Sequence, residues 1–375
     1  MLIQFKVANY RSFGSEVTLS LEAVKAFKEN EENVVGAGGY RLLRSAAIYG
    51  ANASGKTNLV KAISFMREFV RTSASKNSVA EIDTDPFRLD NKAQTRPSLF
   101  EVSFLIDGGT YRYGFEVTKK EVCTEWLLRG TGPRNKEYLL FKRDHDGIEV
   151  LDGYQEGKGK EAETRINALF LSTVDQRNGA IAHLIVQWFE NLSILLGSAE
   201  GLLERLSATM IHVNKAGLSE RVLAFIRQVD DSIVDLISPD VPDAGKKPND
   251  ESDVMTRMLN RQLLIRRARP DGVSVDFDLE RDESAGTKKL MWLAFLWLSY
   301  LDLGETVFVD EMEARLHPHL TRRLVRLFNS PKTNPKNAQL VFVTHDTNLL
   351  TYGGLRRDQV WFCEISPRPH DTGLV

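Results

Sequence analysis

The stretch Gly50-Ala51-Asn52-Ala53-Ser54-Gly55-Lys56-Thr57 decides how the rest of the sequence is interpreted. It matches the pattern G-x-x-x-x-G-K-[ST] and lies between a short apolar run at 46–49, typical of a buried strand, and a helical spacing of apolar residues that starts at Leu59. In this context the glycines let backbone N–H groups converge on phosphate oxygens, and the helix N-terminus adds partial positive charge. We expect Lys56 to reach the β- and γ-phosphates of ATP and the Thr57 hydroxyl to ligate Mg²⁺.

A pair of adjacent acids follows the strand expected at 306–309. The strand is built of β-branched and aromatic residues, and it ends in Asp310 and Glu311. In a nucleotide site built on a phosphate loop, the first acid sits beside the bound Mg²⁺. We therefore expect Asp310 to ligate the metal and Glu311 to orient and deprotonate the attacking water as general base.

Two further segments distinguish this site from that of a small-molecule kinase. Glu283-Ser284-Ala285-Gly286-Thr287-Lys288-Lys289 opens the helix expected before the Asp310 strand, and a Ser and a Gly at a helix N-terminus form an anion site. His345 follows the strand expected at 340–343, where we expect it to contact a γ-phosphate.

Composition bounds the class of protein. The 375 residues carry 49 Lys and Arg against 51 Asp and Glu, a formal net charge of -2, which excludes a wholesale basic nucleic-acid coat but not a local basic groove. The two cysteines, Cys123 and Cys363, cannot form a disulfide framework and are interpreted as structural. The N-terminus lacks a signal-peptide pattern, and the longest apolar run, 290–301, is shorter than the about 20 residues that a membrane span needs. We expect a cytoplasmic protein without membrane contact.

Hydrophobic periodicity outside these motifs predicts an α/β fold. A β-subdomain is expected near 1–45 and 85–150, where apolar and polar residues alternate. Within it, the strands at 100–106 and 110–117 flank Asp107-Gly108-Gly109, a hairpin signature.

Three parts are expected along the chain. Residues 1–160 form an N-terminal ATPase lobe with the phosphate loop and the β-subdomain, and residues 281–375 form a C-terminal ATPase lobe with the S-x-G segment, the adjacent acids and the histidine. Residues 161–280 between them are predicted to be a mainly helical insertion, because apolar residues recur at helical spacing over 184–192 and 222–236.

Three smaller features are interpreted structurally. Residues 239–253, rich in Pro, Gly and Asp, predict a mobile loop. His317 and His319 with Glu311 and Glu313 have the composition of a zinc site, but Pro318 spoils their spacing, so no zinc is expected. A basic run is interpreted as a solvated helix face, with a sequence-blind contact to nucleic-acid phosphates as the alternative. The run consists of Arg257, Arg261, Arg266, Arg267 and Arg269.

The motifs as a set resemble those of a known family. The order of phosphate loop (Walker A), S-x-G signature, D-E pair (Walker B) and Thr344-His345 switch resembles ABC-type ATPases of the SMC, RecF and OLD group. The opening Asn9-Tyr10-Arg11-Ser12-Phe13 resembles the N-[FY]-R-S-F start of such heads. A set of segments is also similar to one bacterial branch of small AAA/ABC-hybrid ATPases, often encoded beside a nuclease or toxin in anti-phage and restriction-type loci. These segments are 50–57, Phe87-Arg88-Leu89, 111–115, 283–289 and 310–318.

The resemblance implies a P-loop NTPase fold, an ABC-type ATPase head with an antiparallel β-subdomain and an inserted helical lobe. It also implies a head-to-tail nucleotide sandwich between at least two copies. ATP held by Lys56 and Thr57 of one subunit would be capped by Ser284 and Gly286 of the other, and Arg11 would lie near the adenine.

The sequence departs from the family pattern in two places. A standard D-loop aspartate does not follow the D-E pair, where Met312–Pro318 stands as in the OLD-like branch. A Q-loop glutamine is not assigned, and Gln94 is a candidate by position only. These departures concern cross-talk between two nucleotide sites more than ATP binding itself.

The family resemblance implies a specific role beyond ATP hydrolysis. Such a chain acts as the sensor or regulatory subunit of a bacterial anti-phage system and controls a nuclease or toxin partner through ATP-dependent assembly. Three alternatives stay open: a RecF-like DNA-repair ATPase, an assembly scaffold with little turnover, and a small-molecule P-loop kinase. No cluster of acids in the sequence outside the ATP site resembles a nuclease centre, so this chain alone is not expected to cut nucleic acid.

Overall fold

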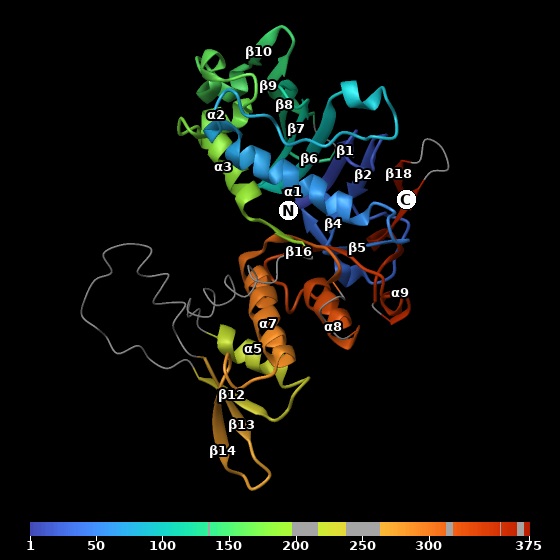
Figure 1. The fold of residues 1–375 in the computed structure, drawn as a ribbon, viewed down its shortest axis with the longest axis vertical. Coiled ribbons are helices and arrows are strands. Elements are labelled where there is room, and N and C mark those ends of the chain that lie inside the picture. Colours follow the sequence, from blue (N-terminus) through green and yellow to red (C-terminus); the bar gives the residue numbers. More distant parts are fainter. Residues whose placement is uncertain (134–135, 197–216, 238–262, 313–317, 353, 366–370) are drawn as a thin grey trace, which may run out of the picture. The chain divides into compact units, whose positions relative to one another are not determined.

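The structure, a computed structural model, describes residues 1–133, 136–196, 217–237, 263–312, 318–352, 354–365 and 371–375 (Figure 1). The chain divides into two compact units, the first made of Met1–Leu196 and Gly304–Val375 and the second of Gly197–Leu303. The loop expected at 239–253 lies outside the described residues. Among the described helices, none combines the length and the apolar character that crossing a membrane requires.

The first unit contains a seven-stranded antiparallel sheet in the order β10-β9-β8-β7-β6-β1-β2. The expected hairpin is confirmed, because β6 and β7 are joined by Asp107 and Gly108, both at positive φ as a tight type I′ turn requires. Phe65 and Phe69 of α1 (Lys56–Thr72) pack on this sheet, with ring centroids 4.8 and 5.5 Å from those of Phe100 and Phe115. The strands are β1 (Leu2–Ala8), β2 (Val17–Ser20), β6 (Ser98–Ile106), β7 (Gly109–Val117), β8 (Val122–Gly130), β9 (Tyr138–Asp144) and β10 (Gly147–Val150).

A second sheet of the first unit carries the order β11-β15-β16-β5-β17-β18. Its first five strands run parallel, and only β18 pairs antiparallel, with β17. The strands are β5 (Ser45–Gly50), β11 (Leu192–Leu195), β15 (Thr306–Val309), β16 (Gln339–Val343), β17 (Val360–Ile365) and β18 (Thr372–Leu374). The buried character expected of β5, β15 and β16 is confirmed, since almost every residue in them is buried.

Shorter elements complete the first unit. The hairpin β3 (Val34–Ala37) and β4 (Tyr40–Leu43) forms a two-stranded sheet of its own. The other α-helices are α2 (Phe170–Asp175), α3 (Ala180–Glu190), α8 (Pro318–Asn329) and α9 (Asn348–Tyr352). The 3-10 helices are η1 (Glu31–Asn33), η2 (Ser73–Ser75), η3 (Ala93–Thr95), η4 (Asp152–Gly157), η5 (Glu161–Glu163) and η7 (Arg357–Gln359).

The second unit joins helices to a three-stranded antiparallel sheet. The helix α5 (Leu218–Ile226) precedes the sheet, and α7 (Ala285–Leu303) follows it. Residues 290–301 of α7 are buried on every side, which confirms their interpretation as core packing. The strands, in the order β12-β13-β14, are β12 (Ile233–Ile237), β13 (Leu264–Ala268) and β14 (Ser274–Asp278).

Over 161–280 the described residues contain the helices α2, α3 and α5 but also four strands, so this part of the chain mixes helices with strands. The helix expected over 222–236 ends at Ile226, and residues 233–237 form β12. Between the helix and β12, the Asp230 carboxylate accepts hydrogen bonds from the Ser232 backbone N–H at 3.2 Å and from the Ser232 hydroxyl at 2.6 Å, which favours a turn over a continued helix. Residues 192–195 form β11, which pairs parallel with β15 in the second sheet of the first unit.

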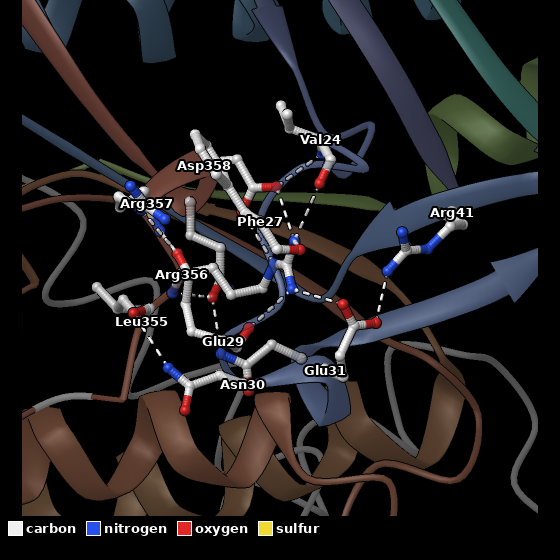
Figure 2. Close-up of polar contacts among 12 residues, drawn as sticks. Val24, Phe27, Glu29, Asn30, Glu31, Arg41, Leu355, Arg356, Arg357 and Asp358 are labelled. Atoms are coloured by element: carbon white, nitrogen blue, oxygen red, sulfur yellow. Dashed lines mark hydrogen bonds and ion pairs between the residues drawn. The ribbon is translucent and has the colours of Figure 1, made fainter.

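Arg356 joins the loop at 24–31 to the segment before β17, as Figure 2 shows. Its side chain is fully buried, and its guanidinium donates to three backbone carbonyls and two carboxylates, so every N–H group is used. The partners are the carbonyls of Val24 (3.4 Å), Phe27 (3.0 Å) and Glu29 (2.8 Å) and the carboxylates of Asp358 (2.9 Å) and Glu31 (3.3 Å).

Replacing Arg356 by Ala is expected to lower the free energy of unfolding by about 3–5 kcal/mol, because the Asp358 carboxylate, whose side chain is 4% exposed, and the three carbonyls lose their partner. Arg177→Ala is the matched control, since its exposed guanidinium pairs with Glu163 at 2.7 Å and its loss should cost at most about 1 kcal/mol. Urea denaturation followed by tryptophan fluorescence measures both. Equal losses in the two variants would contradict the role of Arg356.

Candidate functional site

Three neighbouring parallel strands end at the same edge of the second sheet. The phosphate loop 50–57 follows β5, Asp310 and Glu311 follow β15, and His345 comes two residues after β16. Since β16 pairs with both β5 and β15, the sheet brings these segments to one edge, where open parallel sheets bind their ligands. The structure therefore assembles the sequence-predicted residues of the first unit at one site.

Contacts behind the phosphate loop explain two of its glycines. A Cβ on Gly50, at φ +153°, would lie 2.5 Å from the carbonyl oxygen of Cys363, and one on Gly55, at φ +98°, would lie 2.4 Å from the Thr372 hydroxyl. Ala53 also has a positive φ of 64°. The Ser54 hydroxyl is buried and has no hydrogen-bond partner among the described residues. A loop of this shape, with a spare buried hydroxyl and a helix starting at Lys56, fits a phosphate group.

The two expected metal ligands lie in contact. The Thr57 hydroxyl donates to the Asp310 carboxylate at 3.2 Å. Hydroxyl and carboxylate oxygens are ligands that Mg²⁺ prefers, so the pair fits this ion. Lys56 is mostly buried beside them, and its ammonium group donates to the loop carbonyls of Gly50 at 2.9 Å and Ala51 at 2.7 Å. The lysine charge is thus held at the phosphate loop.

Burial sets the electrostatics of the acids. Desolvation raises the pKa of the Asp310 carboxyl, the hydrogen bond from Thr57 opposes this shift, and the neighbouring Glu311 adds to it. The ionised form of Asp310 is therefore costly until a cation neutralises it. Glu311 is exposed and has a positive φ of 52°, a conformation that is uncommon for a residue with a side chain. Such strain, placed directly after the buried acid, is typical of a functional site.

The segment that carries His345 is tied to β5. The Thr344 backbone N–H donates to the carbonyl of Ile48 at 3.1 Å, and the Tyr49 hydroxyl donates to the carbonyl of Asp346 at 3.0 Å. His345 itself is exposed. Its contact with a γ-phosphate stays a prediction.

Arg11 shares a cavity of about 560 Å³ with the phosphate loop. The Arg11 backbone N–H donates to the carbonyl of Asp85 at 2.7 Å, and its guanidinium lies 3.9 Å from the Asp85 carboxylate. This cavity is a candidate for the base and sugar of the nucleotide. It is lined by Arg11, Ser12, Ala53, Asn58, Asp85, Pro86, Phe87, Arg88, Leu89, Ile365 and Thr372.

Sequence reasoning missed the residues whose hydrogen bonds hold the phosphate loop in place. The Thr372 hydroxyl donates to the carbonyl of Ser54 at 3.0 Å, and the Thr372 backbone N–H donates to the carbonyl of Ser12 at 2.8 Å. Asn58 in turn donates to the Ser12 hydroxyl at 2.9 Å. Ser12 stands beside Arg11 in a motif already singled out, so its role had a signal, whereas no local pattern marks Thr372.

Ser284 and Gly286 belong to the second unit. The Ser284 hydroxyl accepts a hydrogen bond from the Thr287 backbone N–H at 3.1 Å, so it caps the N-terminus of α7. Gly286 has only the Ser284 hydroxyl near its Cβ position, at 3.7 Å, and both residues are exposed. Capping of a second copy's ATP by these residues stays a prediction.

The described part of the basic run lies on or after β13, not on a helix, and is paired with acids. Arg266 pairs with Asp276 at 2.7 Å, Arg267 with Glu283 at 2.7 Å, and Arg269 with Asp271 at 3.3 Å. These pairs favour the structural interpretation of the run over a nucleic-acid contact.

The remaining sequence candidates have mixed outcomes. Arg257, Arg261, Glu313 and His317 lie outside the described residues. Gln94 is exposed in η3 and stays a candidate by position only. Both cysteines are free thiols, Cys363 buried and Cys123 partly buried.

The fold and the site define the class of protein: an ABC/AAA-type P-loop ATPase. The chain belongs to the family described as "AAA domain, putative AbiEii toxin, Type IV TA system", which matches residues 45–351.

Two solved structures bear on the fold. The crystal structure of the SmcHead bound to the C-winged helix domain of ScpA aligns with a TM-score of 0.51 at 15% identity, over 100% of this chain and 96% of that chain, which shows similarity of fold alone. The Smc head domain with an extended coiled coil, bound to the C-terminal domain of ScpA derived from Pyrococcus furiosus, covers 100% of this chain and 95% of that chain at 13% identity, but its TM-score of 0.43 is too low to carry an argument.

One curated protein shares a short stretch with the chain. It is the formate-dependent phosphoribosylglycinamide formyltransferase of Stutzerimonas stutzeri (strain A1501), 81% identical over 21 residues. The match spans 6% of this chain and 5% of that protein, too little to bear on function.

Replacing Gly55 by Ala is expected to weaken ATP binding at least about tenfold, because the new Cβ would clash with the Thr372 and Ser12 hydroxyls and displace the loop. Gly108→Ala is the control for backbone strain alone, since Gly108 also has a positive φ but nothing within 4 Å of its Cβ position. Titration calorimetry with a slowly hydrolysed ATP analogue measures both affinities. An unchanged affinity in the Gly55 variant would show that the loop does not hold the nucleotide.

Proposed function

We propose that the chain binds and hydrolyses ATP with Mg²⁺ and is the sensor or regulatory ATPase of a bacterial anti-phage defence system. It controls a nuclease or toxin partner in the cytoplasm through ATP-dependent head-to-tail assembly. The observation that carries the proposal is the contact between Thr57 and the buried Asp310 beside the phosphate loop. That contact joins the two ligand types of Mg²⁺ at the edge where a nucleotide would bind.

The residues of this site have separable roles in hydrolysis. The loop N–H groups and Lys56 hold the phosphates, and Arg11 lies on the cavity side that would take the base. Thr57 and Asp310 would hold Mg²⁺, which would supply positive charge to neutralise the phosphates. Glu311 accepts a proton from the attacking water. The water oxygen bonds to the γ-phosphorus, and the bond from that phosphorus to the ADP oxygen breaks. His345 contacts the γ-phosphate and signals its presence.

Assembly is supported by the exposed start of α7. Ser284 and Gly286 present the N-terminus of a 19-residue helix, which is a favourable place for an anion. A nucleotide bound by one copy offers such an anion to the other. Binding would then favour the closed pair and hydrolysis would release it, which is the kind of switch a regulatory subunit needs. The family description and an SMC head solved with a bound ScpA domain are in keeping with a partner-controlling ATPase.

Glu311→Gln is expected to lower the rate of ATP hydrolysis about 100-fold or more while ATP binding is kept, because the general base is lost. Light scattering should then show that the molar mass doubles or more on addition of Mg²⁺ and ATP. Adding Ser284→Arg should abolish this rise, since the bulky cation obstructs the capping surface.

Ser274→Arg in the same variant is the matched control, because Ser274 is another exposed serine of the second unit, placed on β14 and outside the signature. Its mass should rise as in the parent variant. A monomer in both states would contradict head-to-tail assembly. The regulatory role fails if a phage-sensitive bacterium carrying the chain with its neighbouring genes is protected equally by the wild type and by Lys56→Ala.

A further inference from the structure

A second cavity lies on α8, in the first unit. Its volume is about 440 Å³, and its lining is basic and hydroxylated with a single aliphatic side chain. The lining residues are His319, Arg322, Arg323, Arg326, Leu327, Ser330 and Thr333. None of them belongs to the nucleotide site described above.

The segment that lines this cavity carries charge of one sign. Between residues 318 and 338 the sequence has three arginines and two lysines, Lys332 and Lys336, and no Asp or Glu, in a chain whose net charge is -2. No ion pair with a described acid involves Arg323 or either lysine. A cation in the last turn of a helix stabilises the helix dipole, which accounts for Arg326 but not for Arg323.

Hydrogen bonds fix the loop that closes the cavity. Asn334 is fully buried, and its amide donates to the carbonyls of Phe328 and Ala338, both at 2.8 Å. The Thr333 hydroxyl donates to the carbonyl of Leu327 at 2.6 Å. Arg44 donates to the carbonyl of Asn334 at 3.2 Å and to the Asn337 side chain at 2.8 Å. The basic cavity is thus held by a rigid frame before any ligand binds.

We propose that this basic cavity binds the phosphate backbone of a nucleic acid. Planar guanidinium groups pair with phosphate oxygens, and hydroxyl groups add neutral donors. The two lysines extend the positive charge along the sequence beyond the cavity lining, which suits a chain of phosphates better than a single anion. An acidic protein segment is less favoured, because protein interfaces depend on aromatic and aliphatic anchors and this cavity offers only Leu327.

The test is the binding of a fluorescein-labelled 20-base-pair DNA duplex to the full chain without nucleotide, followed by anisotropy over a salt series. The wild type should bind with an affinity that falls steeply with salt. Replacing Arg323 and Arg326 together by Gln should weaken binding about tenfold or more and reduce the salt slope by about two. Replacing both by Lys should keep most of the affinity, because the charges remain.

The matched control removes two cations elsewhere in the same unit. Lys119 and Lys120 are exposed in the turn between β7 and β8, and replacing both by Gln should leave the affinity and the salt slope unchanged. Absence of binding by the wild type at low salt would overturn the proposal. An equal loss of DNA affinity in the arginine double variant and in the lysine double variant would also overturn it. So would displacement of the duplex by poly-glutamate at the same concentration as by unlabelled DNA, which would indicate a site for acidic protein. Because no nucleotide is present, these results are independent of ATP hydrolysis.

Discussion

The parallel pairing of β5, β16 and β15 is the constraint on which the rest of the structure depends. It places the ends of three strands side by side, and with them a phosphate loop, a buried acid and an exposed histidine that are far apart in the sequence. The hydrogen bond from Thr57 to Asp310 shows that this strand register brings two possible Mg²⁺ ligands into contact. Hydrogen bonds that involve Thr372, Ser12 and Tyr49 hold this edge of the sheet in place.

Elements with strong local patterns were predictable from the sequence. The strand before Gly50, the helix after it and the type I′ hairpin at Asp107 depend on residues close together in the chain, and all three are confirmed. The misses share a different physical cause. Residues 233–237 have apolar spacing that suits a helix. They form a strand because the turn at Asp230 precedes them and because they pair with β13. Thr372 reaches the phosphate loop only through tertiary structure, so no local signal marks it.

Neither the net charge nor a run of arginines in the sequence indicates which arginines are paired with acids and which line a cavity. The basic run that stands out in the sequence is, where the structure describes it, paired with acids along β13 and β14. The arginines of α8 attract less notice, yet they line a cavity in a stretch without any acid. Arg356 shows a third use, since its fully buried guanidinium holds two distant segments together. The surroundings of each arginine, not its place in a run, indicate its role.

A double-mutant cycle on Thr57 and Asp310 tests the central claim most directly. Titration calorimetry would measure binding of Mg²⁺ with a slowly hydrolysed ATP analogue to the wild type, Thr57→Ala, Asp310→Ala and the double variant. If both residues hold one ion, the double variant should lose little more than the weaker-binding single variant, with a coupling free energy above about 1 kcal/mol. Additive losses, or binding that does not need Mg²⁺, would contradict a shared metal site at this edge of the sheet.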